Sequence, residues 1–128
     1  MVASSLSSRV IGCAIEVSRG LGCGFVEKVY ENALMVELAR TGLMANQQKP
    51  VFVRYRDAIV GEYVVDILVD GRLLVEVKAI DRLNPAHDAQ VMNYLRATGI
   101  QVGLLLNFGK PQLGIRRLVW NHDESMNI

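Results

Sequence analysis

The chain has 128 residues, of which 51% are apolar, 21% charged and 6% aromatic. This length suits one domain, and the apolar content excludes intrinsic disorder. Fourteen Lys and Arg side chains oppose thirteen Asp and Glu, so the net charge of +1 lacks the basic excess of a general nucleic-acid binder. No stretch approaches the roughly 20 apolar residues of a membrane helix, and the N-terminus has no secretory signal pattern.

The two cysteines, Cys13 and Cys23, suit a reducing compartment. Neither belongs to a C-x-x-C pair, which argues against zinc held by cysteine. Cys13 falls on an apolar helical stripe and is expected to pack in the core. We therefore expect a cytoplasmic protein that neither spans nor binds a membrane.

The first forty residues predict two helices. Apolar residues recur at steps of three and four over 4–20, and a run of helix formers over 25–41 ends at Gly42. A glycine-rich break at 20–24 separates the helices. Such a loop can cradle a phosphate, but the more ordinary interpretation is a loop that ends one helix before the next begins.

After Pro50 the apolar period changes from 3.6 to 2, which is typical of strands. Asn84-Pro85 then supplies an N-cap and a first-turn proline for another helix. The remaining elements are expected to be strands from Val51, over 59–69 and 72–80, a helix over 84–98, and strands over 101–107 and 115–120.

This order predicts one mixed α/β domain over 1–120, followed by a loose polar tail over 121–128. The crossover from the 72–80 strand through the helix to the 101–107 strand should be parallel and right-handed.

Three charged residues interrupt two of the apolar strands. Asp66 lies within Tyr63–Val69, and Glu76 and Lys78 lie two apart within Leu73–Ile80. The ordinary interpretation is a solvent-facing edge of a one-sided sheet. The chemical interpretation is a site, because buried charges must pair or bind a metal and carboxylates suit Mg²⁺ or Mn²⁺.

The chemical interpretation sets a condition on the turn between these strands. A two-residue loop at Asp70-Gly71 would pair Asp66 with Val75 and point Asp66 away from Glu76. We therefore predict an odd-length loop or a β-bulge at this turn.

Polar residues on the two flanking helices are further candidates. Glu27 lies on the same side of its helix as Leu34, although a first-turn acid is also favoured by the helix dipole. Gln90 and Tyr94 lie one turn apart, with His87 one turn earlier, and alone they would be semi-buried polar residues. His87 lacks a second histidine at ligand spacing and is rejected as a zinc ligand.

Taken together, Asp66, Glu76-Val77-Lys78 and Gln90-x-x-x-Tyr94 resemble the PD-(D/E)xK nuclease superfamily. The stretch Gly24–Tyr30 also matches the GxxExxY signature of one bacterial and archaeal branch. The resemblance implies a restriction-endonuclease-like αβββαβ core, a mixed sheet and an extra N-terminal helix. It also implies hydrolysis of phosphodiester bonds with Mg²⁺ or Mn²⁺, in DNA rather than RNA.

Residue roles follow from the same resemblance. It makes Glu27, Asp66, Glu76 and the Val77 carbonyl metal ligands. Lys78 becomes the catalytic lysine, supported by Gln90, while Tyr94 lines the site and contacts substrate. Tyr30 belongs to the signature without a role beyond packing, and a homodimer would suit so small a nuclease.

Two other function classes stay open at this point. One is a catalytically silent module that keeps the fold and binds nucleic acid or a protein partner. Its basic residues would be Arg54, Arg56, Lys110, Arg116 and Arg117. The other is an enzyme acting on another acidic substrate, such as a phosphatase, for which no nucleophile constellation is present.

Overall fold

The computed structural model describes residues 5–128 and contains the elements in the predicted order. The helices are α1 (Leu6–Leu21), α2 (Glu27–Arg40), α3 (Pro85–Thr98) and a short 3₁₀ turn, η1 (Glu124–Met126). The strands are β1 (Ala45–Tyr55), β2 (Ala58–Val69), β3 (Leu73–Lys78), β4 (Val102–Asn107) and β5 (Gly114–Val119). Within this range no helix is long and apolar enough to cross a membrane.

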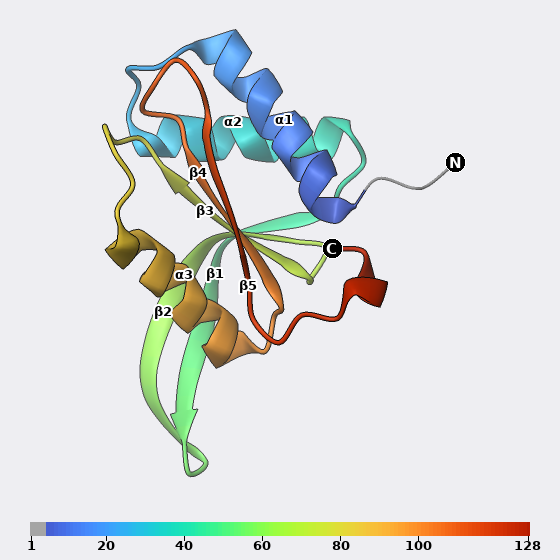
Figure 1. Ribbon diagram of the computed structural model, residues 1–128, viewed down its shortest axis with the longest axis vertical. Helices are drawn as coiled ribbons and strands as arrows, with labels where there is room; N and C mark the ends of the chain where they lie inside the picture. Colours follow the sequence, from blue (N-terminus) through green and yellow to red (C-terminus); the bar gives the residue numbers. More distant parts are fainter. Residues whose placement is uncertain (1–4) are drawn as a thin grey trace.

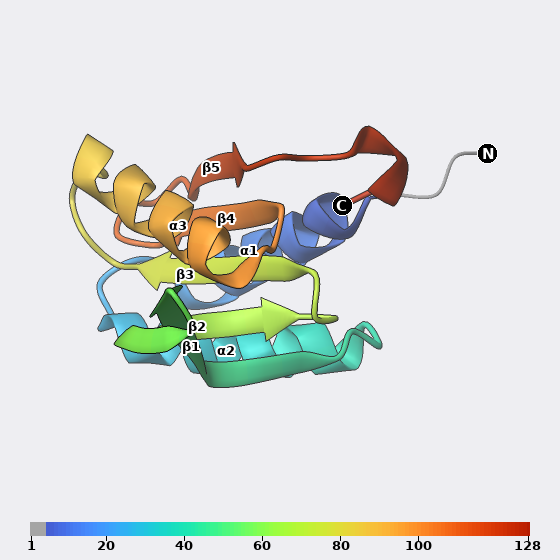
Figure 2. The same ribbon diagram turned by 90° about the horizontal axis from the view of Figure 1, so that it is seen from below.

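The five strands form one mixed sheet in the order β1-β2-β3-β4-β5 (Figures 1 and 2). Strands β3 and β4 are parallel, and every other neighbouring pair is antiparallel. The predicted parallel crossover through α3 is therefore confirmed. The β1–β2 hairpin is long, and Figure 1 shows its tip extending beyond the rest of the domain.

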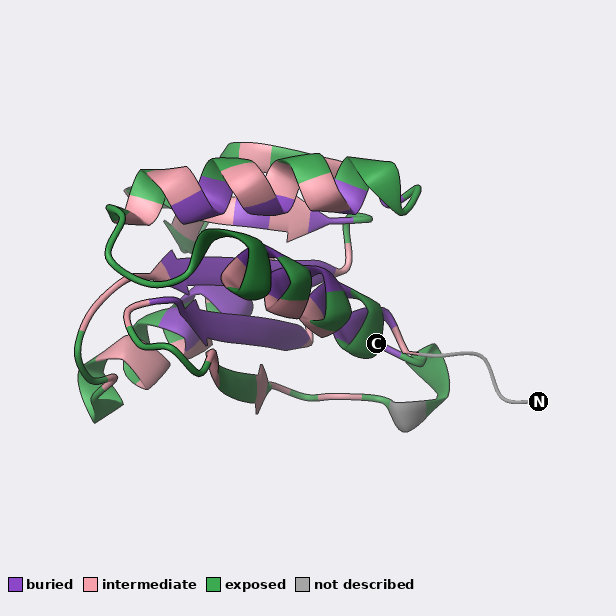
Figure 3. Cartoon of the chain, turned by 90° about the horizontal axis from the view of Figure 1, so that it is seen from above, coloured by how far each residue is buried: buried purple, intermediate pink, exposed green. Residues whose placement is uncertain are grey.

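Two apolar clusters cover the two faces of the sheet. The α1–α2 core joins those helices to residues such as Ile67, Val75 and Leu104. The α3 core joins α3 to residues such as Val65 and Leu74. Because β3 and β4 are covered on both faces, they are almost entirely buried, as Figure 3 shows. Any charge on β3 is thereby taken out of water.

Helix α3 is held at both ends and packs closely on β4. The Asn84 side chain accepts a hydrogen bond from Ala86 N, while His87 Nδ1 accepts one from the Asn84 backbone. Gly99, in the left-handed conformation, ends the helix. Beneath α3, a Cβ on Gly103 would lie 2.7 Å from a Val91 methyl, so glycine permits the close approach.

Two segments differ from expectation. Strand β1 begins at Ala45, ahead of Pro50, because an edge strand tolerates a proline that donates no hydrogen bond. At the other end, Ile128 is buried in the α1–α2 core, and its carbonyl accepts hydrogen bonds from the Ser7 N–H and hydroxyl. The expected loose tail is thus wrong for its last residue.

Candidate active site

The turn between β2 and β3 has the predicted odd length. Val69 pairs with Leu73, which leaves the three residues Asp70, Gly71 and Arg72 in the loop. Asp70 and Gly71 both have left-handed backbone conformations, with φ of 54° and 66°. Continuing this register places Asp66 opposite Glu76, as a shared site requires.

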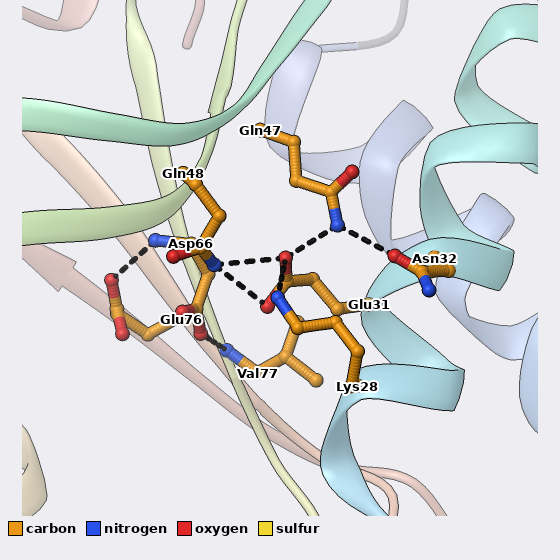
Figure 4. Close-up of polar contacts among 8 residues, drawn as sticks. All are labelled: Lys28, Glu31, Asn32, Gln47, Gln48, Asp66, Glu76 and Val77. Atoms are coloured by element: carbon orange, nitrogen blue, oxygen red, sulfur yellow. Dashed lines mark hydrogen bonds and ion pairs between the residues drawn. The ribbon is translucent and has the colours of Figure 1, made fainter.

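The two strands separate at these acidic residues. Backbone pairing between β2 and β3 ends at Ile67 and Val75, and beyond this pair the strands are joined by hydrogen bonds from backbone N–H groups to side chains. The Asp66 N–H donates to Glu76 Oε1 at 3.0 Å, and the Val77 N–H donates to Asp66 Oδ2 at 2.8 Å (Figure 4). Each carboxyl is therefore held by the backbone of the opposite strand. Asp66 Oδ1 and Glu76 Oε2 take no part in these two hydrogen bonds.

Strand β2 also changes face at this point. Val65 packs in the α3 core and Ile67 in the α1–α2 core, although alternate residues of a regular strand share a face. Across from Asp66 on β1, between Gln47 and Lys49, Gln48 has a left-handed φ of 54°. This conformation is costly for a residue other than glycine. The irregularity of both strands frees Asp66 to turn toward Glu76.

Burial and mutual repulsion oppose the ionisation of both carboxyls of the pair. Glu76 is only 4% exposed. Burial, and then the nearby Asp66 carboxyl, raise the pKa of Glu76 to about 8, against a smaller opposing effect of Lys78. Without a cation, Glu76 thus holds a proton at neutral pH. A bound cation would replace that proton.

Lys78 and Glu27 lie near this pair. Lys78 follows Glu76 by two residues on β3 and is half-buried. Burial raises the pKa of Glu27, in the first turn of α2; the Lys78 charge opposes that rise and the Asp66 charge adds to it. Glu27 is therefore within electrostatic reach of both strands. Within the described chain the Lys78 ammonium forms no hydrogen bond or ion pair.

Helix α3 supplies a tyrosine to the same region. Tyr94 is buried, and desolvation followed by the charges of Glu76 and Asp66 raises its pKa to about 12. Its ring lies 5.5 Å from that of Tyr63 on β2. Gln90, one turn earlier, is exposed, and among residues 5–128 its amide forms no hydrogen bond. The placing of Gln90 against Lys78 stays a prediction.

The donor set suits a hard cation only in part. Asp66 and Glu76 provide adjacent carboxyl oxygens, the ligands that Mg²⁺ and Mn²⁺ prefer. Nevertheless, no three His, Cys, Asp or Glu side chains in the described chain are grouped closely enough to hold a metal ion. The roles of Glu27 and of the Val77 carbonyl as ligands stay predictions.

The structure gives Tyr30 a role that sequence reasoning missed. Its hydroxyl donates to Gly22 O at 2.6 Å and accepts from Phe25 N at 3.2 Å, while its ring stacks on Phe108 at 4.9 Å. Tyr30 thereby ties the glycine-rich loop to α2. The bond therefore holds the loop that leads into α2, the helix that Glu27 begins.

Glu31 is a second buried acid that sequence reasoning missed. Its side chain is 2% exposed and accepts hydrogen bonds from Lys28, Gln47 and Gln48 (Figure 4). Burial raises the pKa of Glu31, but these three hydrogen bonds lower it more, below its ordinary value. Glu31 thus braces α2 against the irregular part of β1. Its signal in the sequence is its place one helical turn after Glu27.

Asn107 on β4 positions the chain just beyond Lys78. Its Oδ1 accepts from Ile80 N and Gly109 N, both at 3.0 Å, and its Nδ2 donates to Ile80 O at 2.9 Å. A Cβ on Gly109 would lie 2.1 Å from Ile80 O, so this approach requires glycine. These contacts hold the end of β3, where the lysine is located.

Comparison with known proteins supports the fold and the family. No curated protein matches the chain. Among solved structures it is similar to SSO0001, known from its crystal structure, with a TM-score of 0.58 and 15% sequence identity. That similarity covers 77% of this chain and 52% of the other, so the chain spans about half the length of SSO0001. It shows a shared fold alone.

The family match is broader. The sequence profile of the PD-(D/E)XK nuclease superfamily matches residues 4–118. This range contains the three α-helices and, except for the last residue of β5, the five strands of the sheet. The restriction-endonuclease-like α/β fold is thereby confirmed, with α1 as the additional N-terminal helix. The chain belongs to the PD-(D/E)XK nuclease superfamily.

Proposed function

We propose that this protein is a Mg²⁺- or Mn²⁺-dependent nuclease that hydrolyses phosphodiester bonds, in DNA rather than RNA, and that it belongs to the GxxExxY branch. The observation that carries the proposal is the buried Asp66–Glu76 pair. Its two carboxyls face each other where β2 and β3 separate, with one oxygen of each outside the hydrogen bonds to the opposite strand. Two buried carboxyls placed this close together favour a cation, which would replace the proton that Glu76 otherwise keeps.

Asp66 and Glu76 would hold the metal, and Glu27 and the Val77 carbonyl are its proposed further ligands. When bound, such an ion activates water and stabilises charge on the phosphoryl oxygens. The N–H groups of Asp66 and Val77 orient the two carboxyls before any ion arrives. This preorganisation lowers the reorganisation that binding requires.

The remaining residues act on the substrate. Lys78 has no anionic partner at bonding distance in the described chain, so its ammonium is available to the scissile phosphate or the attacking water. Tyr94, whose pKa is raised to about 12, keeps its proton at neutral pH and donates a hydrogen bond to a phosphate oxygen. Gln90 would support Lys78.

The test compares metal-dependent cleavage in matched variants. Linear, nicked and single-stranded DNA are incubated with the protein in Mn²⁺ or in EDTA. We expect products only with Mn²⁺, and a loss of at least about 100-fold in Glu76→Gln and Lys78→Gln, because the first removes a proposed metal ligand and the second removes the ammonium proposed to contact the reacting phosphate. The control is Arg19→Gln, which removes an exposed cation from α1. Equal rates in all three variants would contradict the proposal.

Within residues 5–128 no group of three His, Cys, Asp or Glu side chains could hold a metal ion, which favours one alternative, a silent module that binds nucleic acid. Binding of this kind weakens steeply with salt and needs no metal. Salt-sensitive binding that is unchanged by Glu76→Gln, without cleavage in Mn²⁺, would support it. Cytoplasmic location and a homodimer remain proposals beside either function.

A further inference from the structure

A cavity of about 520 Å³ lies between the β1–β2 hairpin and α3. Phe52, Arg54 and Tyr63 from the hairpin form one wall. Arg96 from α3 and Trp120, just after β5, contribute to the rest. A volume in this range is typical of sites for small organic groups.

The lining is cationic and aromatic. Neither Arg54 nor Arg96 forms an ion pair within residues 5–128, and no Asp or Glu of that range lines the cavity. Phe52 is 41% exposed and Tyr63 is 48% exposed, which is unusual for rings of this size. Free guanidinium groups beside open ring faces suit a ligand with flat rings and negative charge.

Two tyrosines lie between the cavity and the acidic pair. Tyr63 lines the cavity on one side and contacts the Tyr94 ring on the other. Tyr94 in turn is close enough to Glu76 and Asp66 for their charges to affect its pKa. A strand held in the cavity would therefore have a neighbouring phosphate near the proposed catalytic residues.

We propose that this cavity binds an unpaired nucleotide of the substrate strand, so that the enzyme prefers single-stranded nucleic acid to a duplex. The base stacks on the exposed rings, and Arg54 and Arg96 bind the flanking phosphates. A paired base cannot enter, because its ring faces are covered by its neighbours in the helix. This inference rests on the proposed nuclease function and adds the class of substrate.

The chain offers an internal probe, since Trp120 is its only tryptophan and lines the cavity. In EDTA, the whole protein is titrated with single-stranded DNA and RNA oligonucleotides and with a duplex of the same length. We expect either single strand to quench Trp120 emission and to bind at least about ten-fold more tightly than the duplex, the change that stacking one base supports.

Matched variants assign the effect to the cavity. Phe52→Ala removes a lining ring, whereas Tyr55→Ala removes an exposed ring near the hairpin tip. Arg96→Gln removes a lining charge, whereas Arg40→Gln removes an exposed charge from α2, which packs on the other face of the sheet. We expect about ten-fold weaker single-strand binding in the first of each pair and little change in the second.

The outcomes distinguish a failure of the cavity proposal from a failure of the proposed nuclease activity. Equal binding of duplex and single strand, or lining variants that bind like their controls, would overturn the inference while metal-dependent cleavage could still stand. Conversely, selective quenching by single strands without cleavage in Mn²⁺ would support the cavity and reject the nuclease.

Discussion

The charge on Glu76 should make the metal-free protein less stable as the pH rises. The pKa of Glu76 is raised from 4.5 to about 8 in the folded protein, chiefly by burial and then by Asp66. Between those pH values the folded state keeps a proton that the unfolded chain has released, so unfolding is favoured as pH increases. At about 1.4 kcal/mol per pH unit, the shift corresponds to roughly 5 kcal/mol of unfolding free energy.

The substitution that isolates this effect is Glu76→Gln. Glutamine keeps an oxygen for the Asp66 N–H and adds an amide that can donate to the Asp66 carboxyl, without a proton to lose. Below about pH 4.5 the variant and the wild type should have similar stability. At pH 8.5 and above, the variant should be more stable by several kcal/mol, approaching roughly 5 kcal/mol.

The assay is urea unfolding in EDTA, followed by circular dichroism at several pH values from 4.5 to 9. The control is Glu16→Gln, which removes an exposed carboxyl from α1. Stability curves of Glu76→Gln and wild type that run parallel over the whole pH range would refute the reasoning. They would mean that Glu76 titrates like an ordinary exposed carboxyl.

Four further predictions follow from the geometry. At pH 8.5, Mn²⁺ at 100 times its dissociation constant should stabilise the wild type by about 2.7 kcal/mol and Glu76→Gln by much less, as thermal melts will show. Gly103→Ala crowds α3 against β4 and should cost about 1–3 kcal/mol in urea unfolding, whereas Gly12→Ala, in open space on α1, should be neutral or stabilising. Tyr30→Phe keeps the stacked ring but loses the hydrogen bond to the glycine-rich loop, so it should cost about 1 kcal/mol in urea unfolding. It should also lower the rate of cleavage in Mn²⁺, and an unchanged rate would argue against a positioning role. Asn107→Ala leaves the N–H groups of Ile80 and Gly109 and the Ile80 carbonyl without their partner and should cost about 2–3 kcal/mol; a smaller loss in urea unfolding would mean that water replaces the amide.

Local pattern determined most of the fold. The change of apolar period after Pro50 predicted strands, and Asn84-Pro85 predicted the start of α3, because such signals depend on backbone geometry and neighbouring residues. The requirement that Asp66 and Glu76 share a site also predicted the odd-length turn, since side chains alternate along a strand.

Only the tertiary structure decided which polar groups pair across the domain. Asn107 binds Ile80 across 27 positions, and Ile128 reaches back to Ser7 across 121. No local period encodes such partners, because they depend on how the packed elements meet.

The charge state of the site has the same origin. Glu76 interrupts an apolar strand, so the sequence alone marked it as exceptional. Its pKa depends on the layers that cover β3 and on the change of face in β2 that turns Asp66 toward it. Residue type and spacing determined which groups are present, whereas packing decided how far they are removed from water and therefore which of them keeps its proton.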